Sequence, residues 1–321
     1  MELSAIYGLI KEDLAKVEDR LRMVSKADFP SMAELLDYSL RSGGKRIRPV
    51  LTLLSGKFYD YNLDYLLPMA TAVEIMHTAT LVHDDAIDNS LVRRGRPTVN
   101  KLWGDEKSVL LGDYLFAEAG ALTASTGNLR AIKLFAETLK TISSGELNQS
   151  FNVFNLEQSL PQYFQRVAQK TASLFCMATE SGAALSQAPE ESIQTLKDYA
   201  YNLGIAFQVV DDVLDFIGTE EELGKPTGSD LAQGTLTLPS ILLLEYYPED
   251  NPVERLFKHR DEQDNIKLAV ELVRNSPIIE ECYQVASDYS AKACSGIKSL
   301  PDNPARQALM ELANYIVSRK K

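Results

Sequence analysis

Apolar residues recur at spacings of three and four along almost the whole chain, the pattern of helices that bury one face. Alternation of apolar and polar residues, which marks β-strands, does not recur. The pattern predicts helices at about 1–24, 32–40, from Pro49, from Pro68 to about 90, and at 108–125, 128–152, 159–184, 192–217, 238–246, 262–275, 278–298 and 304–318. No Pro/Ser-rich linker interrupts them, so we expect an all-α fold with a single large domain over 1–321.

Charge and cysteine content narrow the possible functions. The 321 residues carry a net charge of −12, which argues against general nucleic-acid binding. Three cysteines form no disulfide framework or zinc motif and suit a reducing, cytoplasmic location. The longest stretch without a charge, 231–244, is shorter than the ~18 residues of a membrane span. We therefore expect a cytoplasmic protein without a signal peptide or transmembrane segment.

Two copies of one acidic motif are the strongest functional signal. Asp84-Asp85-Ala86-Ile87-Asp88 and Asp211-Asp212-Val213-Leu214-Asp215 both read DDxxD, each near the end of an apolar helix. Residues three and four apart share a helix face, so each motif projects carboxylates to one side. Such oxygen ligands suit Mg²⁺, which binds through a few carboxylates together with water or phosphate. A solvated acidic helix face is the alternative, but it does not explain the basic segments near both motifs.

Polar neighbours on the same helices support a site. His77 lies seven residues before Asp84, two helical turns away on the same face. Gln208 lies three residues before Asp211. Either residue alone is more often an ordinary core or surface side chain.

Basic residues gather at a few places in this acidic chain. Gly43-Gly44-Lys45-Arg46-Ile47-Arg48-Pro49 is a basic loop that enters a helix N-terminus, where backbone N–H groups and Lys/Arg can hold phosphate. Arg93-Arg94 follows the first motif, Lys225 follows the second, and Lys170-Thr171 lies within a helix. The sequence therefore predicts a phosphate or diphosphate ligand bound together with Mg²⁺.

Other catalytic signatures are missing from the sequence. It contains no GxSxG, no Walker GxxxxGK[ST] and no GxGxxG. Only three histidines are present, so general-base chemistry is thinly supplied. Metal-assisted loss of diphosphate would need no such base.

These segments resemble the trans-polyprenyl diphosphate synthases of the isoprenoid synthase fold. The matching stretches follow the family's order: GGKRIRP at 43–49, HTATLVHDDAID at 77–88, RRGRPT at 93–98, GDYLFA at 112–117, KTASLF at 170–175, FQVVDDVLDF at 207–216 and GKPTGSDLAQGTLTLP at 224–239. The resemblance implies an all-α bundle around a deep central pocket, usually as a homodimer. It implies a prenyltransferase that joins isopentenyl diphosphate to an allylic diphosphate by ionisation, condensation and proton loss, with the departing diphosphate taking the proton.

The resemblance also implies roles for individual residues. Three Mg²⁺ ions would be held mainly by Asp84, Asp88 and Asp211, with Asp85, Asp212 and Asp215 in support. Isopentenyl diphosphate would be held by Lys45, Arg48, His77 and Arg94. The allylic diphosphate would be held by Arg93, Lys170, Thr171, Gln208 and Lys225, of which Lys170 and Lys225 would also assist catalysis. Many members carry Lys where this chain has Thr235, so one phosphate contact is expected to be weaker.

Small residues one turn before the first motif predict a long product. Family members that stop at short products often place Phe or Tyr where this chain has Ala79 and Thr80. We expect a product of about six to ten isoprene units by family analogy, handed to a membrane or carrier. Met76, Phe135 and Leu139 are candidates for a deeper pocket floor. The alternative is that Ala79 and Thr80 only pack within the helix bundle and that the pocket floor lies deeper.

Three alternatives stay open. The chain could be the catalytic subunit of a heteromeric synthase, a shorter-chain geranylgeranyl synthase or a class I terpene cyclase. Cyclases usually keep one DDxxD and lack the GGKRIRP loop, whereas both motifs and the loop are present here. A non-catalytic partner subunit would lose aspartates, and all six are retained. The sequence does not specify the product length, the allylic primer or the downstream pathway, which quinone, carotenoid and lipid synthesis would all allow.

Overall fold

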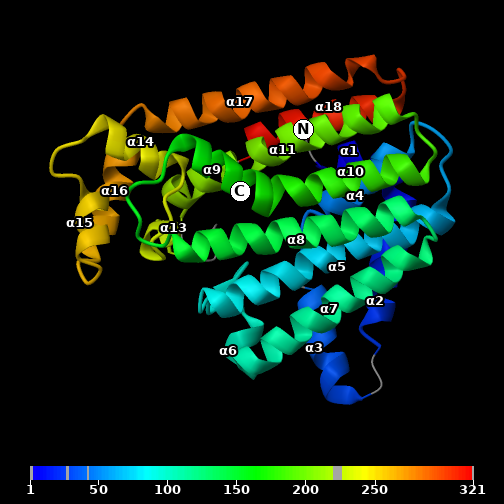
Figure 1. Cartoon of the computed structure of the whole chain (residues 1–321), viewed down its shortest axis with the longest axis horizontal. Helices are drawn as coiled ribbons and strands as arrows, with labels where there is room; N and C mark the ends of the chain where they lie inside the picture. Colours follow the sequence, from blue (N-terminus) through cyan, green and yellow to red (C-terminus); the bar gives the residue numbers. More distant parts are fainter. Residues whose placement is uncertain (1–2, 27–28, 42, 220–225, 320–321) are drawn as a thin grey trace.

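The computed structural model is a layered bundle of long helices, and it describes residues 3–26, 29–41, 43–219 and 226–319 (Figure 1). Its longer helices are α2 (Lys11–Val24), α3 (Pro30–Leu40), α4 (Ile47–Gly56), α5 (Leu63–Ile87), α7 (Asp105–Ser125), α8 (Leu129–Phe151), α10 (Ser173–Leu185), α11 (Glu190–Ile217), α16 (Asp264–Arg274), α17 (Ile278–Gly296) and α18 (Pro304–Ser318). The shorter helices are α1 (Leu3–Ile6), η1 (Tyr7–Ile10), α6 (Val99–Trp103), α9 (Leu160–Val167), η2 (Ala168–Ala172), α13 (Ser229–Ala232), α14 (Leu238–Tyr246), α15 (Pro252–Lys258) and η3 (Ile297–Ser299). The predicted all-α class is confirmed.

Capping residues explain where several helices begin. The side chains of Asn62, Asn128 and Asn303 accept hydrogen bonds from first-turn N–H groups of α5, α8 and α18. Ser159 forms a capping box with Gln162 at the start of α9. These polar residues satisfy N–H groups that have no partner inside a helix.

Several details of the expected helices were wrong. The segment 1–24 is not one α-helix, because Tyr7–Ile10 forms a 3-10 turn between α1 and α2. Pro68 does not begin a helix but lies inside α5, past its first turn, and the cap at Asn62 sets the start six residues earlier. The segment 159–184 is not uniformly α-helical, because 168–172 forms a π-helical turn. A two-residue hairpin, β1 (Val92–Arg93) with β2 (Arg96–Pro97), follows α5, and α15 was not anticipated.

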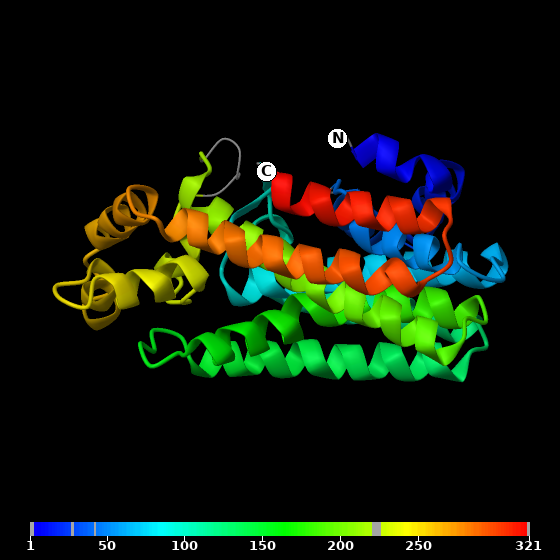
Figure 2. The same ribbon diagram turned by 90° about the horizontal axis from the view of Figure 1, so that it is seen from above.

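The core consists of two hydrophobic clusters that share α11. The first joins α2, α4, α5, α7, α10 and α18 with the N-terminal half of α11. The second joins α9, α14, α16 and α17 with the C-terminal half of α11. Viewed from above, α8 lies along one face of the bundle and α18 along the opposite face (Figure 2). The single domain over 1–321 stays a prediction that this shared helix supports.

Helix α5 lies at the centre of the packing. It is long and apolar enough to cross a membrane by length and composition, but 72% of its apolar window is buried inside the protein. That burial identifies it as a core helix, since buried helices are apolar on all sides. On α10, Gly182 allows close approach to α4, because a Cβ there would lie 2.2 Å from the Thr52 carbonyl oxygen.

Candidate active site

The first acidic motif ends α5 and divides into two kinds of carboxylate. Arg93 of the hairpin binds Asp85, with its Nε 2.8 Å and its Nη2 2.8 Å from Oδ1. Within the described part of the chain, the carboxylates of Asp84 and Asp88 make no hydrogen bond or ion pair. Asp88 caps the helix by donating its N–H to the Asp84 carbonyl at 2.8 Å. Asp84 and Asp88 are one turn apart, so they share a face and are available to a cation.

The surroundings of these two carboxylates favour their neutral forms. Burial raises the pKa of Asp84 to about 7, and the negative charge of Glu146 adds to the effect. Burial likewise raises the pKa of Asp88. Lys170 and Arg93 oppose both shifts but do not cancel them. A divalent cation would reverse this balance and favour the ionised forms.

The second motif lies on α11, and its first two acids face different surroundings. Asp211 is 38% exposed and its Oδ1 lies 2.7 Å from Nη2 of Arg319. Asp212 is buried, where it accepts hydrogen bonds from Tyr163 at 2.6 Å and from Gln208 at 2.8 Å. Burial, and then the charge of Asp230, raises the pKa of Asp212 to about 7. Asp212 is therefore held inside the fold, whereas Asp211 is partly exposed and paired with Arg319.

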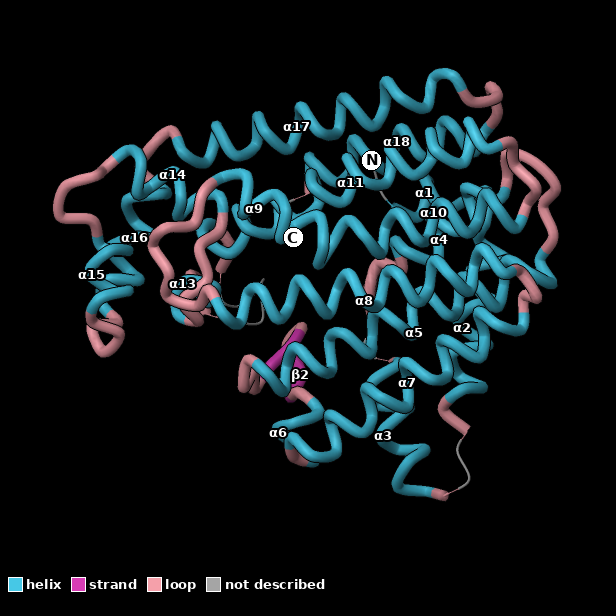
Figure 3. The backbone as a smooth tube through the Cα atoms, in the orientation of Figure 1, coloured by secondary structure: helices cyan, strands magenta, loops and turns pink. Residues whose placement is uncertain are grey.

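Asp215 fixes the start of α13. Its Oδ1 accepts a hydrogen bond from the Ser229 hydroxyl at 2.8 Å, and its backbone carbonyl accepts from the Gly228 N–H at 2.9 Å. Asp230 next to Ser229 raises the pKa of both Asp88 and Asp212. The two motifs thus share an electrostatic neighbour, and α5 and α11 both run toward the end of the bundle with the hairpin and α13 (Figures 1 and 3).

Arg48, His77 and Arg94 form one basic group. The guanidinium of Arg48 lies 5.0 Å from the centre of the Phe175 ring, and its buried Nε has no hydrogen-bond partner in the described structure. Burial lowers the pKa of Arg48 to about 10, with Glu74 opposing and Arg94 adding to the shift. Burial and then Arg48 and Arg94 hold the pKa of His77 well below its usual value, so its imidazole is neutral. An anion here would relieve both effects.

The glycine loop completes this basic group. Arg94 donates through Nη1 to the Gly43 carbonyl, which ties the hairpin to the loop. The Lys45 carbonyl accepts a hydrogen bond from Tyr7 at 2.7 Å, and the Lys45 ammonium lies 5.8 Å from the Tyr315 ring centre. Gly44 has a φ of +146°, and a Cβ there would lie 2.9 Å from Arg94 Nη1. Glycine is favoured at that point because residues with a Cβ rarely adopt this φ.

A second polar group surrounds the π-helical turn. Lys170 lies on this turn, 2.7 Å from Glu146 and 2.9 Å from Gln149 of α8. Thr171 donates to Gln208 at 2.8 Å, and Gln208 in turn donates to Asp212. A π-turn inside a helix is frequent at functional sites. The structure thus links Lys170 to the first motif by charge, and Thr171 and Gln208 to the second by hydrogen bonds.

The remaining predicted residues are Lys225, the chain-length residues on α5 and Thr235. Lys225 lies outside the described residues. Met76 and Ala79 are fully buried on α5, whereas Thr80 is half-buried and donates to the His77 carbonyl at 2.8 Å. Thr235 donates its backbone N–H to the Asp230 carbonyl at 2.8 Å.

Sequence reasoning missed several residues of this site. Glu74 lies three residues before His77 on α5, a spacing that could have revealed it. Arg319 near the C-terminus and Tyr163 on α9 carry no such signal, because each is far in sequence from the motif that it contacts.

The donor set fits a cation that brings further oxygen ligands with it. Among the described residues, no group of three or more His, Cys, Asp or Glu side chains is close enough to hold a metal ion. Mg²⁺ usually binds through one or two carboxylates plus substrate phosphates. That pattern matches the half-buried Asp84 and the exposed Asp88, whose carboxylates lie near Lys170 and Arg93.

Comparison with known proteins gives one consistent family. The polyprenyl synthetase family model matches residues 29–273. The chain is 37% identical over 321 residues to heptaprenyl diphosphate synthase component 2 of Geobacillus stearothermophilus, covering 99% of each protein.

Solved structures agree with that match. A polyprenyl synthase from Caulobacter crescentus, complexed with calcium and isoprenyl diphosphate, superposes with a TM-score of 0.95 at 34% identity and covers 100% of this chain and 98% of the other. A decaprenyl diphosphate synthase from Rhodobacter capsulatus superposes with a TM-score of 0.92 at 37% identity and covers both chains fully.

Proposed function

The chain belongs to the polyprenyl synthetase family, and we propose that it is the Mg²⁺-dependent synthase of a long all-trans prenyl diphosphate. It is a prenyltransferase whose substrates are isoprenyl diphosphates. The observation that carries the proposal is the separation of the basic residues into two groups beside the two acidic motifs. In this proposal one group holds isopentenyl diphosphate and the other an allylic diphosphate.

In the proposed site, Asp84, Asp88 and Asp211 hold the metal ions, of which we expect three. Bound Mg²⁺ would neutralise charge on the allylic diphosphate and so favour loss of that group. Asp85, Asp212 and Asp215 support the ligands through Arg93, Tyr163 and Ser229. Hydrogen bonds to the groups beside metal ligands set the orientation of those ligands.

The chain's own cations hold the two diphosphates. We assign Lys45, Arg48, His77 and Arg94 to isopentenyl diphosphate. We assign Arg93, Lys170, Thr171, Gln208 and Lys225 to the allylic diphosphate. The desolvated Arg48, whose Nε has no partner in the described structure, is an unusually strong donor for a phosphate oxygen. The allylic C–O bond breaks, the isopentenyl double bond forms the new C–C bond, and the departing diphosphate takes the proton.

The product is proposed to be long because no bulky side chain closes the first turn before Asp84. Ala79 and Thr80 are small, and Met76 lies one further turn away on α5. We propose that the growing tail runs beside this face, with the floor at Met76 or deeper, near Phe135 and Leu139.

We propose a homodimer, which exposed apolar residues on neighbouring helices support. Leu110 on α7 and Leu129 and Ile132 on α8 are exposed. Leu147, near the other end of α8 and so closer to Leu110, is also exposed, and exposed apolar side chains gathered on adjacent helices favour an interaction surface. A relative named component 2 makes a heteromer the competing possibility. Light scattering measures the mass of the purified chain, and the product assay below measures its elongation. A dimer that elongates alone supports the homodimer. A chain that elongates only with an added partner contradicts it.

The proposed location is the cytoplasm, from which the apolar product is handed to a membrane. The three cysteines are free, as expected in a reducing compartment.

A product assay tests the function. The purified chain is incubated with Mg²⁺, isopentenyl diphosphate and farnesyl diphosphate, and the prenyl alcohols are sized after phosphatase treatment. We expect a ladder that ends at about six to ten units, by analogy with the family. Products of four units or fewer would identify a geranylgeranyl-type synthase, and cyclic hydrocarbons would identify a cyclase; either result overturns the proposal.

A further inference from the structure

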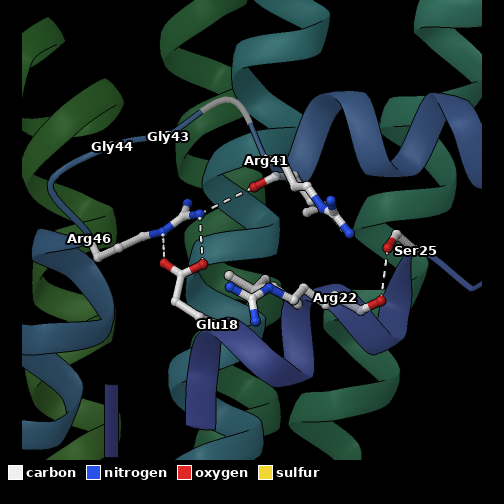
Figure 4. Close-up of a pocket in the computed structure, with 9 residues that line it drawn as sticks. Glu18, Arg22, Ser25, Arg41, Gly43, Gly44 and Arg46 are labelled. Carbon is white, nitrogen blue, oxygen red and sulfur yellow. Dashed lines mark hydrogen bonds and ion pairs between the residues drawn. The ribbon is translucent and has the colours of Figure 1, made fainter. Parts of the chain in front are cut away.

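The glycine loop ends on an arginine whose side chain turns away from the proposed substrate site. Arg46 stands between Lys45 and Arg48, yet it adopts the left-handed backbone conformation, with φ 51° and ψ 31°. Non-glycine residues rarely occupy this region, and they persist there when surrounding contacts hold them. In Figure 4 the Arg46 side chain points at Glu18 across the cleft behind the loop.

The contacts that hold Arg46 come from three helices. Its Nε lies 2.5 Å from Glu18 Oε1 and its Nη2 3.2 Å from Glu18 Oε2, both on α2. Its Nη1 lies 2.7 Å from Glu74 Oε1 on α5, and Nη2 also donates to the Leu40 carbonyl of α3 at 3.2 Å. Arginine alone among the side chains offers a fork that can satisfy two carboxylates at once.

This bridge supports the loop on the side that faces α2. A surface cleft of about 530 Å³ lies there, lined by Glu18, Arg22, Arg41, Gly43, Gly44 and Arg46 among others. The loop therefore does not rest on a filled core on that side. Its front is tied to Arg94 through the Gly43 carbonyl, so it is held between Arg94 and Arg46.

Glu74 connects the bridge to the basic group of the site. It is buried on α5, one turn before His77. Its charge is the leading favourable charge felt by both Arg48 and Arg94. Arg46 holds this carboxylate at a fixed place beneath the two arginines, and so it influences how they present their donors.

We propose that Arg46, bridging Glu18 and Glu74, is a positioning residue that sets the directions of Lys45 and Arg48 toward isopentenyl diphosphate. The inference rests on the proposed function. Arg46 is not a ligand itself, because its guanidinium makes four hydrogen bonds to Glu18, Glu74 and the Leu40 carbonyl. Loss of the bridge loosens one substrate subsite and leaves in place the allylic subsite, whose described residues lie on β1, η2 and α11.

Two substitutions test the role, one that weakens the bridge and one that breaks it. Glu18→Gln removes one charge from the bridge but keeps the Arg46–Glu74 pair, and Glu18 is 36% exposed, so the fold should tolerate it. Arg46→Lys keeps the charge but cannot reach both carboxylates. The matched control is Arg22→Met, which lines the same cleft and pairs with Asp19 at the surface. Each variant is assayed for KM of both substrates, for kcat and for thermal stability.

We expect Glu18→Gln to raise the KM for isopentenyl diphosphate about 3- to 10-fold, with the farnesyl diphosphate KM and kcat within about twofold. Arg46→Lys should raise the same KM by about tenfold or more, and Arg22→Met should change nothing. Equal increases in both KM values, or a lower melting temperature with no KM change, would assign the bridge a merely structural role. If Arg46→Lys does not fold, Glu18→Gln decides.

A separate variant distinguishes this inference from the proposed function. Arg48→Lys lies in the proposed subsite itself and should raise the KM for isopentenyl diphosphate. If it does and Glu18→Gln does not, positioning by Arg46 is refuted and the proposed function stands. If Arg48→Lys leaves that KM unchanged, the assignment of the subsite is refuted.

Discussion

Replacing Asp84 by asparagine should stabilise the metal-free protein while it removes a proposed metal ligand. Burial raises the pKa of Asp84 to about 7 from a usual value near 3.8. About three pKa units correspond to about 4 kcal/mol between the charged and neutral forms. Asparagine has nearly the same shape without the charge, and its unmet hydrogen bonds in this buried place cost about 2–3 kcal/mol. We expect a net gain on the order of 1–2 kcal/mol at pH 8.

The pH dependence gives the prediction its sign. Between pH 3.8 and about 7 the folded chain holds a proton on Asp84 that the unfolded chain has lost. Stability from this group is therefore present at low pH and falls as the pH rises toward 7. The advantage of Asp84→Asn should shrink by about 1.4 kcal/mol for each pH unit below 7. At pH 5.5 the variant should be no more stable than the parent.

Thermal unfolding in EDTA at pH 8.0 and pH 5.5 measures this difference. A gain of 1–2 kcal/mol raises the melting temperature by about 2–4 °C in a chain of this size. Asp261→Asn, an exposed position between α15 and α16, is the matched control and should change nothing. Adding Mg²⁺ and inorganic diphosphate should stabilise the parent more than the variant. A variant less stable than the parent at pH 8, or a gain that is independent of pH, would refute the reasoning.

Three further substitutions probe packing, chain length and the second motif. Gly182→Ala should lower stability by about 1–3 kcal/mol, because its Cβ would lie 2.2 Å from a backbone oxygen, whereas Gly8→Ala, with open space around it, should be tolerated; urea unfolding compares them. Ala79→Phe should shorten the product by at least one isoprene unit, seen by sizing the prenyl alcohols, and an unchanged ladder would place the tail elsewhere. Arg319→Met should tighten Mg²⁺ binding by up to about fivefold in titration calorimetry without diphosphate, because it removes the cation paired with Asp211; weaker binding would contradict that role.

The helices and the acidic motifs could be predicted from the sequence because both depend on local spacing. Apolar periodicity found α8 and α11 within two residues of their ends, and the i, i+4 spacing put Asp84 and Asp88 on one face. The hairpin was missed because two-residue strands leave no alternation to detect. Pro68 misled because the cap at Asn62, rather than the proline, sets the start of α5.

The different contacts made by the aspartates within each motif could not be predicted from their spacing. Asp211 and Asp212 are adjacent in sequence, yet one meets Arg319 and the other Tyr163. Both partners come from distant parts of the chain, which the fold alone brings together. The left-handed turn at Arg46 likewise depends on carboxylates contributed by α2 and α5.

The central claim is that the two motifs act as one metal site on one diphosphate. A double-mutant cycle tests it most directly, with Mg²⁺-dependent binding of a non-reactive allylic diphosphate analogue measured by calorimetry for the parent, Asp84→Asn, Asp211→Asn and the double variant. We expect each single variant to lose about tenfold or more in affinity. The double variant should bind only slightly more weakly than the single variant with the lower affinity, because the carboxylates act together. Losses that add in full would show that the motifs bind independently and would contradict the account.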